Sequence, residues 1–512
     1  MLSTGVYPPI FQTFRRKGIF CFKFFKNFKW RYVIVDDKLP CCKVFQKNTP
    51  KKLIYGKCRS CNEFWVPLIE KAYAKIHSNY SALVSGFIDD GLVDLTGLTA
   101  KKVLINQEDR TNPNKIEALW NLLMENSTID FGKHKYETKE GKKVTAKIYT
   151  RNKSMMGCSV DPAGKKVEME VIIENQHTGV MCGHAYSILD CFEIPKPRSK
   201  KPRKTSRLLR IRNPWGCKEW NGKWCDDSDE VIANKERIES ALNKKYEGTN
   251  EKISLSDEDG CFIMCFSDFR KIFNKLYICV NYPPEYIGIR YYGKWTSKET
   301  GGLPINNKPS EFQDFYKNPQ YYFSLGKSSK IYISLLQEDG RLSGKKFPFG
   351  EIVKKVCLLL FRTRGKRRID DFNNIIDKTL IVQRRDLSME IELDKGEYVI
   401  IPSTLTKGEY ANFCIEIYIE DTLQKGRKGE PFTFDRLTNF RMEKLGGEDA
   451  KYELIKDTLS EEAEGVRENK KEFIFAQFKN CLQNNDDTDY TYGRGSSGRS
   501  EDELGEFADE IY

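Results

Sequence analysis

The amino-acid sequence predicts an α+β protein with two folded regions and a charged C-terminal tail. Between residues 18 and 280, strand-like segments are mixed with a segment whose apolar residues recur at helical spacing. From 281 to 420, seven or eight short strand-like segments are separated by Gly, Pro and Asn and show no helical period. This second pattern is typical of an antiparallel β-sandwich. A chain of 512 residues is long enough to give each region its own core.

The first region is expected to begin with two strands and a helix. Residues 18–39 contain I-F-C-F-K-F-F and W-R-Y-V-I-V, which are rich in aromatic and β-branched residues and favour two strands around a turn. Residues 63–80 have helical spacing and predict a helix with one face on a core. Later strands should form an antiparallel sheet, and they are expected at 143–150, 167–174, 184–190 and 206–212.

The second region is expected to consist of strands without helices. Its strand-like segments lie at 321–325, 330–336, 356–362, 379–383, 389–393, 397–401 and 413–419. Beyond residue 420 the sequence is charged. The spacing of apolar and charged residues at 470–478 would allow a short amphipathic helix. Residues 484–512 are rich in Asp, Gly and Ser and are expected to be disordered.

Composition limits the class of protein. A hydrophobic content of 39% is ordinary for globular proteins. The sequence has no apolar run of about 18 residues, and its start lacks a basic segment followed by an apolar one, so neither a membrane span nor a secretory signal is expected. The 16 cysteines are scattered, which favours free thiols and a cytoplasmic location. Cys41, Cys42, Cys58 and Cys61 leave zinc binding as an alternative, although adjacent cysteines are a poor first pair of ligands.

A histidine and an asparagine stand at the ends of two neighbouring strands. His184 precedes one apolar strand, and Asn213 follows the next. An imidazole that carries protons for a nucleophile needs a neighbour that fixes its tautomer and ring orientation, and a side-chain amide can do this. We therefore interpret the pair as two thirds of a cysteine-protease triad. The alternative is a structural histidine, which is the commoner role of a lone histidine ahead of a strand.

The sequence around this pair resembles a known enzyme family. G-H-A-Y-S at 183–187, R-I-R-N-P-W-G at 210–216 and E-W-N-G-K-W at 219–224 closely resemble the catalytic domain of calpains, which are cytosolic calcium-dependent cysteine endopeptidases. The resemblance covers roughly residues 18 to 420. Further matching segments are G-I-F at 18–20, V-D-D-K-L-P at 35–40, N-E-F-W-V-P-L-I-E-K-A-Y-A-K at 62–75, M-G-C-S at 156–159, D-G-C-F-I-M-C-F-S-D-F at 259–269, K-N-P-Q-Y at 317–321 and Y-V-I-I-P-S at 398–403.

The resemblance implies a domain organisation. Residues 1–17 lie outside it, 18–280 resemble an incomplete papain-like calpain protease core, and 281–420 resemble the C2-like β-sandwich that follows this core. Residues 421–512 form a divergent, charged and partly disordered tail. Calpains often continue into EF-hands, but a loop starting at Asp487 would place Tyr492 at the turn glycine and Gly498 at the bidentate glutamate. No EF-hand is expected.

The resemblance also implies roles for individual residues. His184 would be the acid/base, Asn213 would orient its ring, and Trp215 would shield their contact from water. Glu219, Asp226 and Asp259 match the acidic ligands of a calcium ion in the same subdomain. Cys261 replaces the glutamate of that ligand set, and because calcium prefers oxygen donors, a weakened site is expected unless Asp257, Glu258 or Asp227 compensates. A solvated acidic loop is the alternative. A second core ion, expected near Asp94, would be partial at best.

The family's nucleophile is what the sequence lacks. It belongs to a Q-G-x-x-G-D-C-W motif N-terminal to the segment that matches 18–20, and no cysteine occurs in residues 1–17. Cys182 is expected to lie on the same strand and face as His184 and to be structural. Cys158 matches a family position other than the nucleophile. The chain as written is therefore expected to be inactive, as a fragment or incomplete gene product of an active calpain, with a non-catalytic adaptor as the alternative.

The expected partners follow from these two interpretations. A protease would act on cytosolic or cytoskeletal proteins, whereas an adaptor would bind such proteins or acidic phospholipid. The segment 196–207, K-P-R-S-K-K-P-R-K-T-S-R, is strongly basic and is expected to be a solvated hairpin tip, with an anionic partner as the alternative. Nucleic acid is not expected, because no aromatic residues are interleaved with these charges. The sequence does not determine whether a small regulatory subunit exists.

Overall fold

The computed structural model describes most of the first 455 residues. The described ranges are 15–42, 52–58, 63–137, 143–152, 154–161, 169–173, 175–195, 205–246, 255, 259–282, 286–343, 353–363, 365, 367–420, 440–445 and 452–455. They belong to two compact units, one containing 15–85 and the other running from 86 to 455 apart from residues 341–348. The helix expected at 470–478 and the disorder expected at 484–512 lie outside the described residues.

The smaller unit contains a hairpin and a helix, as expected. Strands β1 (Ile19–Lys26) and β2 (Lys29–Asp36) pair antiparallel. The two residues between them, Asn27 and Phe28, have positive φ angles of 48° and 65°, which suits a two-residue hairpin turn. Helix α2 (Trp65–Ile76) begins two residues later than the predicted segment. Its Tyr73 ring packs on Phe24 of β1, with ring centroids 5.4 Å apart.

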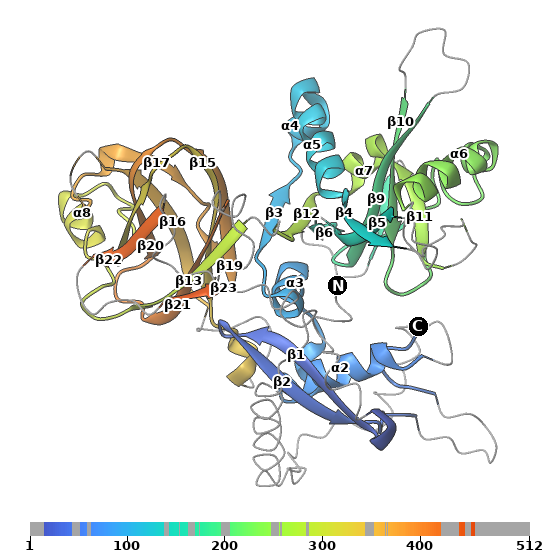
Figure 1. The fold of residues 1–512 in the computed structure, drawn as a ribbon, viewed down its shortest axis with the longest axis horizontal. Helices are drawn as coiled ribbons and strands as arrows, with labels where there is room; N and C mark the ends of the chain where they lie inside the picture. Colours follow the sequence, from blue (N-terminus) through green and yellow to red (C-terminus); the bar gives the residue numbers. More distant parts are fainter. Residues whose placement is uncertain are drawn as a thin grey trace. The chain divides into compact units, whose positions relative to one another are not determined.

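The larger unit starts with a helix-rich segment and a six-stranded antiparallel sheet. The strand order is β11 (Cys261–Cys265), β10 (Thr205–Arg212), β9 (Ala185–Pro195), β6 (Ser154–Ser159), β12 (Lys275–Val280) and β3 (Ala100–Leu104). The helices are α3 (Ile88–Thr96), α4 (Gln107–Thr111), α5 (Pro113–Asn126), α6 (Asp229–Lys245) and α7 (Phe266–Ile272). The predicted antiparallel sheet carrying the histidine and asparagine strands is thus confirmed (Figure 1).

Two clusters of buried apolar side chains pack helices against this sheet. On one side, Trp120 and Leu123 of α5 and Phe269 of α7 pack with Leu209 and Phe262 of the sheet. On the other, α6 buries every third or fourth residue against β9 and β10, which explains its amphipathic sequence: Val231, Ile238 and Leu242 meet Phe192 and Leu208. The central strands β9 and β10 are therefore covered on both faces, and their ends are rigidly placed.

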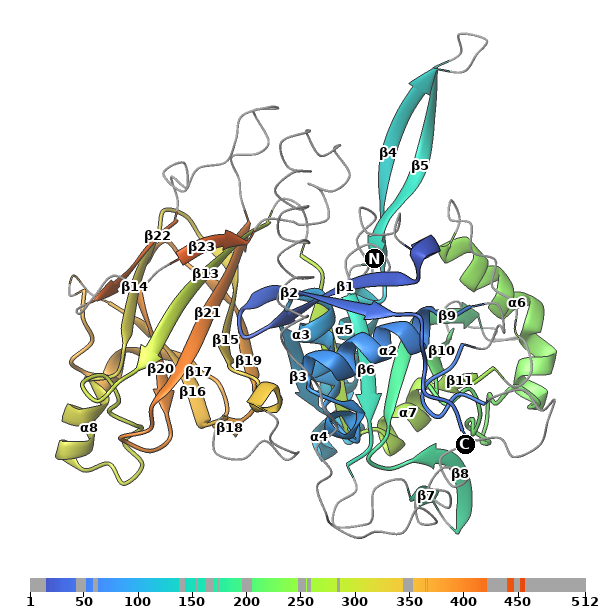
Figure 2. The ribbon, with the colours of Figure 1, turned by 90° about the horizontal axis from the view of Figure 1, so that it is seen from below.

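Two smaller hairpins belong to the same unit. β4 (Ile129–Glu137) pairs with β5 (Lys143–Asn152), and Figure 2 shows this hairpin extending well beyond the six-stranded sheet. β7 (Glu170–Ile173) pairs with β8 (Gln176–Met181). β7 and β5 confirm the strands predicted at 167–174 and 143–150.

The predicted β-sandwich is present, and it is larger than expected. One sheet has the order β19 (Asp386–Leu393), β15 (Ser329–Gln337), β21 (Ala411–Glu420), β13 (Tyr286–Trp295) and β23 (Tyr452–Ile455). The other has β17 (Ile375–Lys378), β16 (Lys355–Arg362), β20 (Gly396–Thr404), β14 (Gln320–Leu325) and β22 (Phe440–Leu445), with β18 (Val382–Gln383) also paired to β16. Their facing side chains, such as Ile331, Leu358 and Ile415, form one core.

Three details of the sandwich differ from the sequence expectation. We expected it to end near residue 420, but β22 and β23 pair with β14 and β13. We expected no helix, yet α8 (Pro309–Phe315) places Phe315 in a second apolar cluster beside Phe361 and Val399. Of the strand expected at 379–383, only Val382–Gln383 is a strand, β18; β17 ends at Lys378, just before the predicted segment, although the N–H of Thr379 still donates to the carbonyl of Leu358.

The sandwich meets the six-stranded sheet through a buried polar interface. The backbone N–H of Ala100 in β3 donates to Asp386 at the start of β19, 3.2 Å away. The hydroxyls of Thr99 and Ser334 are 2.8 Å apart. Among the described residues, none of the helices is both long and apolar enough to cross a membrane.

Candidate active site

The ends of β9 and β10 bring the predicted histidine and asparagine together. The two strands are antiparallel neighbours, with Arg212 opposite Ser187, so the residue before β9 and the residue after β10 meet at one edge. Nε2 of His184 lies 2.9 Å from Oδ1 of Asn213. Asn213 is fully buried, and His184 is 9% exposed. The structure therefore brings together the two residues that the sequence singled out.

The backbone around Asn213 fixes which way its amide points. Its Nδ2 donates to the carbonyls of Cys217 and Lys218 at 2.8 and 3.0 Å. Its Oδ1 accepts the backbone N–H of Trp215 at 3.1 Å. An amide held in this way presents oxygen to the imidazole, and oxygen can only accept, so the network assigns the proton to Nε2 of His184. Nδ1 is then the ring nitrogen that can exchange a proton with a nucleophile.

Two aromatic rings hold the imidazole in place. The Trp215 ring lies on it with centroids 4.1 Å apart and a tilt of 38°. Tyr186 meets it edge-on at 5.0 Å, and the Tyr186 hydroxyl accepts the backbone N–H of Met181. Trp215 was predicted at this site, as a residue that shields the contact between His184 and Asn213 from water. Tyr186 was not, although its position two residues after His184 on β9 places it on the same face of the strand.

The structure corrects the expected position of Cys182. β8 ends at Met181 and β9 begins at Ala185, so Cys182 lies in a turn and does not share a strand with His184. Gly183 in that turn has a φ of +69°, which breaks the strand. The Cys182 side chain is buried in the main hydrophobic cluster, as expected for a structural residue. Cys158 is fully buried in the same cluster, and burial raises the pKa of its thiol well above the usual range.

One exposed cysteine, Cys217, lies close in sequence to Asn213. Of the cysteines in the described ranges, Cys217 alone is classed as exposed. It lies four residues after Asn213, and its carbonyl accepts the Asn213 amide. Cys217 was not predicted as a site residue, because it lies between the two family-like segments 210–216 and 219–224.

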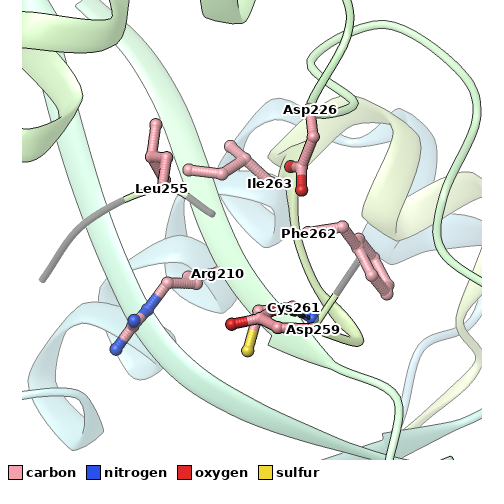
Figure 3. Close-up of a pocket in the computed structure, with 7 residues that line it drawn as sticks. All are labelled: Arg210, Asp226, Leu255, Asp259, Cys261, Phe262 and Ile263. Atoms are coloured by element: carbon pink, nitrogen blue, oxygen red, sulfur yellow. Dashed lines mark hydrogen bonds between the residues drawn. The ribbon is translucent and has the colours of Figure 1, made fainter. Parts of the chain in front are cut away.

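The predicted acidic ligands converge beside the same edge of the sheet. Figure 3 shows Asp226, Asp259 and Cys261 lining one pocket together with Arg210. Burial raises the pKa of Asp226 to about 7, and the nearby charges of Glu219 and Asp259 raise it further. The charges of Glu219 and Asp259 thus oppose the ionisation of Asp226, and a cation among the three carboxylates would stabilise them.

The fourth side chain of the group does not suit calcium. Burial, followed by the charge of Asp259, raises the pKa of the Cys261 thiol to about 12, so it is protonated at neutral pH. A neutral thiol is a poor ligand for a hard cation. The carboxylates of Glu219, Asp226 and Asp259 fit calcium in donor type, whereas Cys261 does not replace the oxygens of a glutamate.

Gly260 joins the acidic group to the histidine–asparagine pair. Its N–H donates to Oε1 of Glu219 at 2.6 Å, and its carbonyl accepts the N–H of Asn213 at 2.7 Å. Its φ is +79°, and a Cβ there would lie 2.6 Å from the Asn213 carbonyl oxygen. Only glycine suits this position. A change in the acidic loop can therefore reach Asn213 through a single residue.

Asp94, near which a second ion was expected, is engaged differently. It is fully buried, and its Oδ1 accepts from Arg385 of the sandwich at 2.8 Å. The carboxylate thus contributes to the contact between the two domains.

Comparisons with known proteins agree with both folded regions. A sequence model of calpain family cysteine proteases matches residues 4–280. A second, for domain III of the calpain large subunit, matches residues 291–418.

Individual proteins of known identity are similar over most of the chain. Calpain-5 of Mus musculus is 29% identical over 79% of this chain and 58% of its own length. Calpain-9 of Rattus norvegicus is 28% identical over 79% of this chain and 52% of its own. The calpain-type cysteine protease ADL1 of Oryza sativa subsp. japonica is also 28% identical over 79% of this chain, which corresponds to 16% of its own length. The chain thus spans less than two thirds of each of these relatives.

Proposed function

Because the chain belongs to the calpain family of cysteine proteases, we propose that it carries the acid/base half of a calcium-dependent endopeptidase of the cytoplasm. The observation that supports this most directly is the 2.9 Å contact between Nε2 of His184 and Oδ1 of Asn213, covered by Trp215. The substrates proposed are cytosolic or cytoskeletal proteins cut in exposed, extended segments. The scattered free thiols are consistent with a reducing compartment.

The proposed chemistry follows from the tautomer of His184. With Nε2–H donating to Asn213, Nδ1 accepts the proton of an attacking thiol and returns it to the leaving amine. Asn213 keeps the ring in one orientation through both transfers, because its own amide is anchored to two carbonyls. Trp215 keeps water from competing for Asn213 Oδ1. Trp215 and Asn213 position the reacting groups, and His184 carries the proton.

We further propose that residues 1–512 do not hydrolyse peptide bonds on their own. None of the 16 cysteines occurs in a Q-G-x-x-G-D-C-W context. In the described part of the chain, the thiols of Cys158, Cys191 and Cys279 are fully buried with raised pKa values, which makes them poor nucleophiles.

The test is a proteolysis assay of the purified full chain with calcium and an unfolded protein substrate. No cleavage is expected from residues 1–512. Cleavage that disappears in His184→Ala would overturn the proposed inactivity. The variants Cys217→Ala and Cys182→Ala would then identify the nucleophile, with the exposed Cys217 the first candidate.

Calcium is proposed to bind Glu219, Asp226 and Asp259. When bound, the ion would supply positive charge between these carboxylates and hold the loop that contains Gly260. The protein's own residues already link this loop to Asn213. The expected affinity is weak because Cys261 contributes no carboxylate.

A non-catalytic role in binding acidic phospholipid is the second candidate, and one feature of the sandwich favours it. Around the edge strand β17, Leu380 and Ile381 are 72% and 50% exposed. Lys378, the last residue of β17, is an exposed cation two residues before Leu380. Exposed apolar residues next to a cation suit the surface of an anionic membrane.

Vesicle co-sedimentation tests this candidate. The double variant Leu380→Ser/Ile381→Ser should lose binding to phosphatidylserine vesicles, while reversal of the charges in 196–207 measures the contribution of the basic segment. Equal sedimentation of all three proteins would exclude these surfaces.

A further inference from the structure

Lys218 adopts a backbone conformation that side chains rarely adopt. Its φ is +57°, in the left-handed region that favours glycine. Residues held in this region cluster at functional sites, where surrounding contacts compensate for the unfavourable conformation. At Lys218 the compensating contact is visible, because its carbonyl accepts the Asn213 amide at 3.0 Å.

This conformation places the lysine side chain over Trp215. Nζ of Lys218 lies 5.3 Å from the centroid of the Trp215 ring, within the range of a cation–π contact. Trp215 in turn lies against His184, with ring centroids 4.1 Å apart. A positive charge is therefore held one aromatic ring away from the proposed acid/base.

The charge of Lys218 is not neutralised by a direct ion pair. Within the described ranges, no carboxylate oxygen lies within 4.0 Å of its Nζ, and the side chain is exposed. Glu170, whose pKa the charge of Lys218 helps to lower, is engaged elsewhere: it accepts the N–H of Gly179 at 2.6 Å and pairs with His177 at 2.8 Å. Glu219 accepts the N–H of Gly260. The lysine charge is thus available to a ligand that binds beside Trp215.

The chemistry of peptide cleavage places this charge relative to a substrate. The imidazole gives its proton to the amine that leaves, so the residue just after the scissile bond must lie beside His184. Trp215 packs against that ring, and Nζ of Lys218 lies over Trp215. We propose that Lys218 determines specificity, by favouring polypeptides with Asp or Glu directly after the scissile bond. This inference rests on the proposed protease function of the same site.

The size of the preference for an acidic residue follows from the exposure of Lys218 and of the substrate carboxylate that it would pair with. An ion pair at a solvent-exposed position changes binding by about two- to fivefold. High salt weakens it, because the screening length falls to about 3 Å at 1 M ionic strength. A preference of this size, removed by salt, is the expected signature of Lys218.

The test measures peptide binding separately from cleavage. Fluorescently labelled peptides that differ only in one central residue, Asp, Ala or Lys, are titrated with the full chain in fluorescence anisotropy. Wild type should bind the Asp peptide about two- to fivefold more tightly than the Lys peptide. Lys218→Gly should remove the preference while retaining the backbone, because glycine adopts the same φ without strain. Lys218→Glu should reverse it.

A matched control makes the same charge change elsewhere. Lys235 is an exposed lysine of α6 in the same unit, so Lys235→Glu should leave the preference unchanged. Equal binding of the three peptides, binding of none of them, or a preference that persists in Lys218→Gly would overturn the inference.

The two proposals can fail separately. If ¹⁵N labelling shows that His184 does not carry its proton on Nε2 while the Asp preference depends on Lys218, the acid/base function is wrong and the binding role of Lys218 stands. If His184 carries the proton on Nε2 and the peptides bind without an Asp preference, Lys218 has no role in specificity while the acid/base function stands.

Discussion

Nη2 of Arg385 lies 2.8 Å from Oδ1 of Asp94 and joins the β-sandwich to helix α3 of the protease-like domain. Nη1 of the same guanidinium lies 3.1 Å from Asp339. Arg385 is 5% exposed, and both carboxylates are buried. Nη1 also lies 4.0 Å from the buried Asp90, so one arginine compensates three buried carboxylates at the domain contact.

Replacing Arg385 should destabilise the chain strongly. Removing one partner of a buried ion pair leaves the other charge uncompensated, at a cost of about 3–5 kcal/mol. Arg385→Ala should lower the free energy of unfolding by that amount in urea denaturation. The control is the exposed pair of Lys407 and Asp314, where Lys407→Ala should cost about 1 kcal/mol or less. Similar losses in the two variants would contradict the assignment of Arg385 as an interdomain anchor.

Asp386 should make stability fall as pH rises. Burial raises the pKa of its carboxyl well above the ordinary 3.8, and the charges of Asp89 and Asp90 add to this, while Arg385 opposes it. Since the folded state holds the proton more tightly than the unfolded chain, stability present at low pH is lost between pH 3.8 and the raised folded pKa.

The variant Asp386→Asn tests this dependence. The amide keeps an acceptor for Ala100 and carries no charge, so its advantage over wild type should grow by up to about 1.4 kcal/mol per pH unit within that window. Urea unfolding at several pH values measures the difference. Asp377→Asn, at an exposed position of β17, should run parallel to wild type at every pH. Parallel curves for Asp386→Asn would show that the carboxyl is not protonated in the folded protein.

Asn213 should control the tautomer of His184. In wild type, selective ¹⁵N labelling of the four histidines should show His184 protonated at Nε2 and not at Nδ1. Asn213→Ala removes the acceptor, so the signal should move towards a mixture of both tautomers. His177, which pairs with Glu170 on β7, serves as the unaffected control. An unchanged His184 spectrum in the variant would mean that another group fixes the ring.

Cys261 should limit the affinity for calcium. Cys261→Glu adds a carboxylate to the three already present, and ligand charge is a main determinant of calcium affinity, so the Kd should fall by about tenfold or more. Isothermal titration calorimetry measures it. Cys261→Ser, which is similar in size and neutral, should bind about as weakly as wild type, and Asp226→Asn should bind more weakly still. If the glutamate variant gains nothing, the acidic group is a solvated loop.

The sequence predicted the features that repeat locally. The alternation in β9 and β10, the helical period of α2 and the short strands of the sandwich each carry their signal within a few residues. The closeness of His184 and Asn213 followed from two adjacent strands that had to be antiparallel. These predictions required no knowledge of distant contacts.

Other features could not be predicted, because they depend on backbone groups and on distant contacts that no residue type in the sequence indicates. The carbonyls of Cys217 and Lys218 orient Asn213, and backbone groups are the same at every position of a sequence. The turn at Gly183, which removes Cys182 from the strand of His184, depends on one positive φ. β22 and β23 are short edge strands whose pairing is set by partners more than a hundred residues away, so they could not be identified locally.

The contact between His184 and Asn213 closes a loop of only 29 residues in sequence. Contacts this local form early in folding, because little chain entropy is lost in closing them. The β9–β10 hairpin can therefore bring the two side chains together before the sandwich docks through Arg385, a contact that spans 291 residues. The paired histidine and asparagine are a product of local folding, and they can be in place before the distant parts of the chain have met.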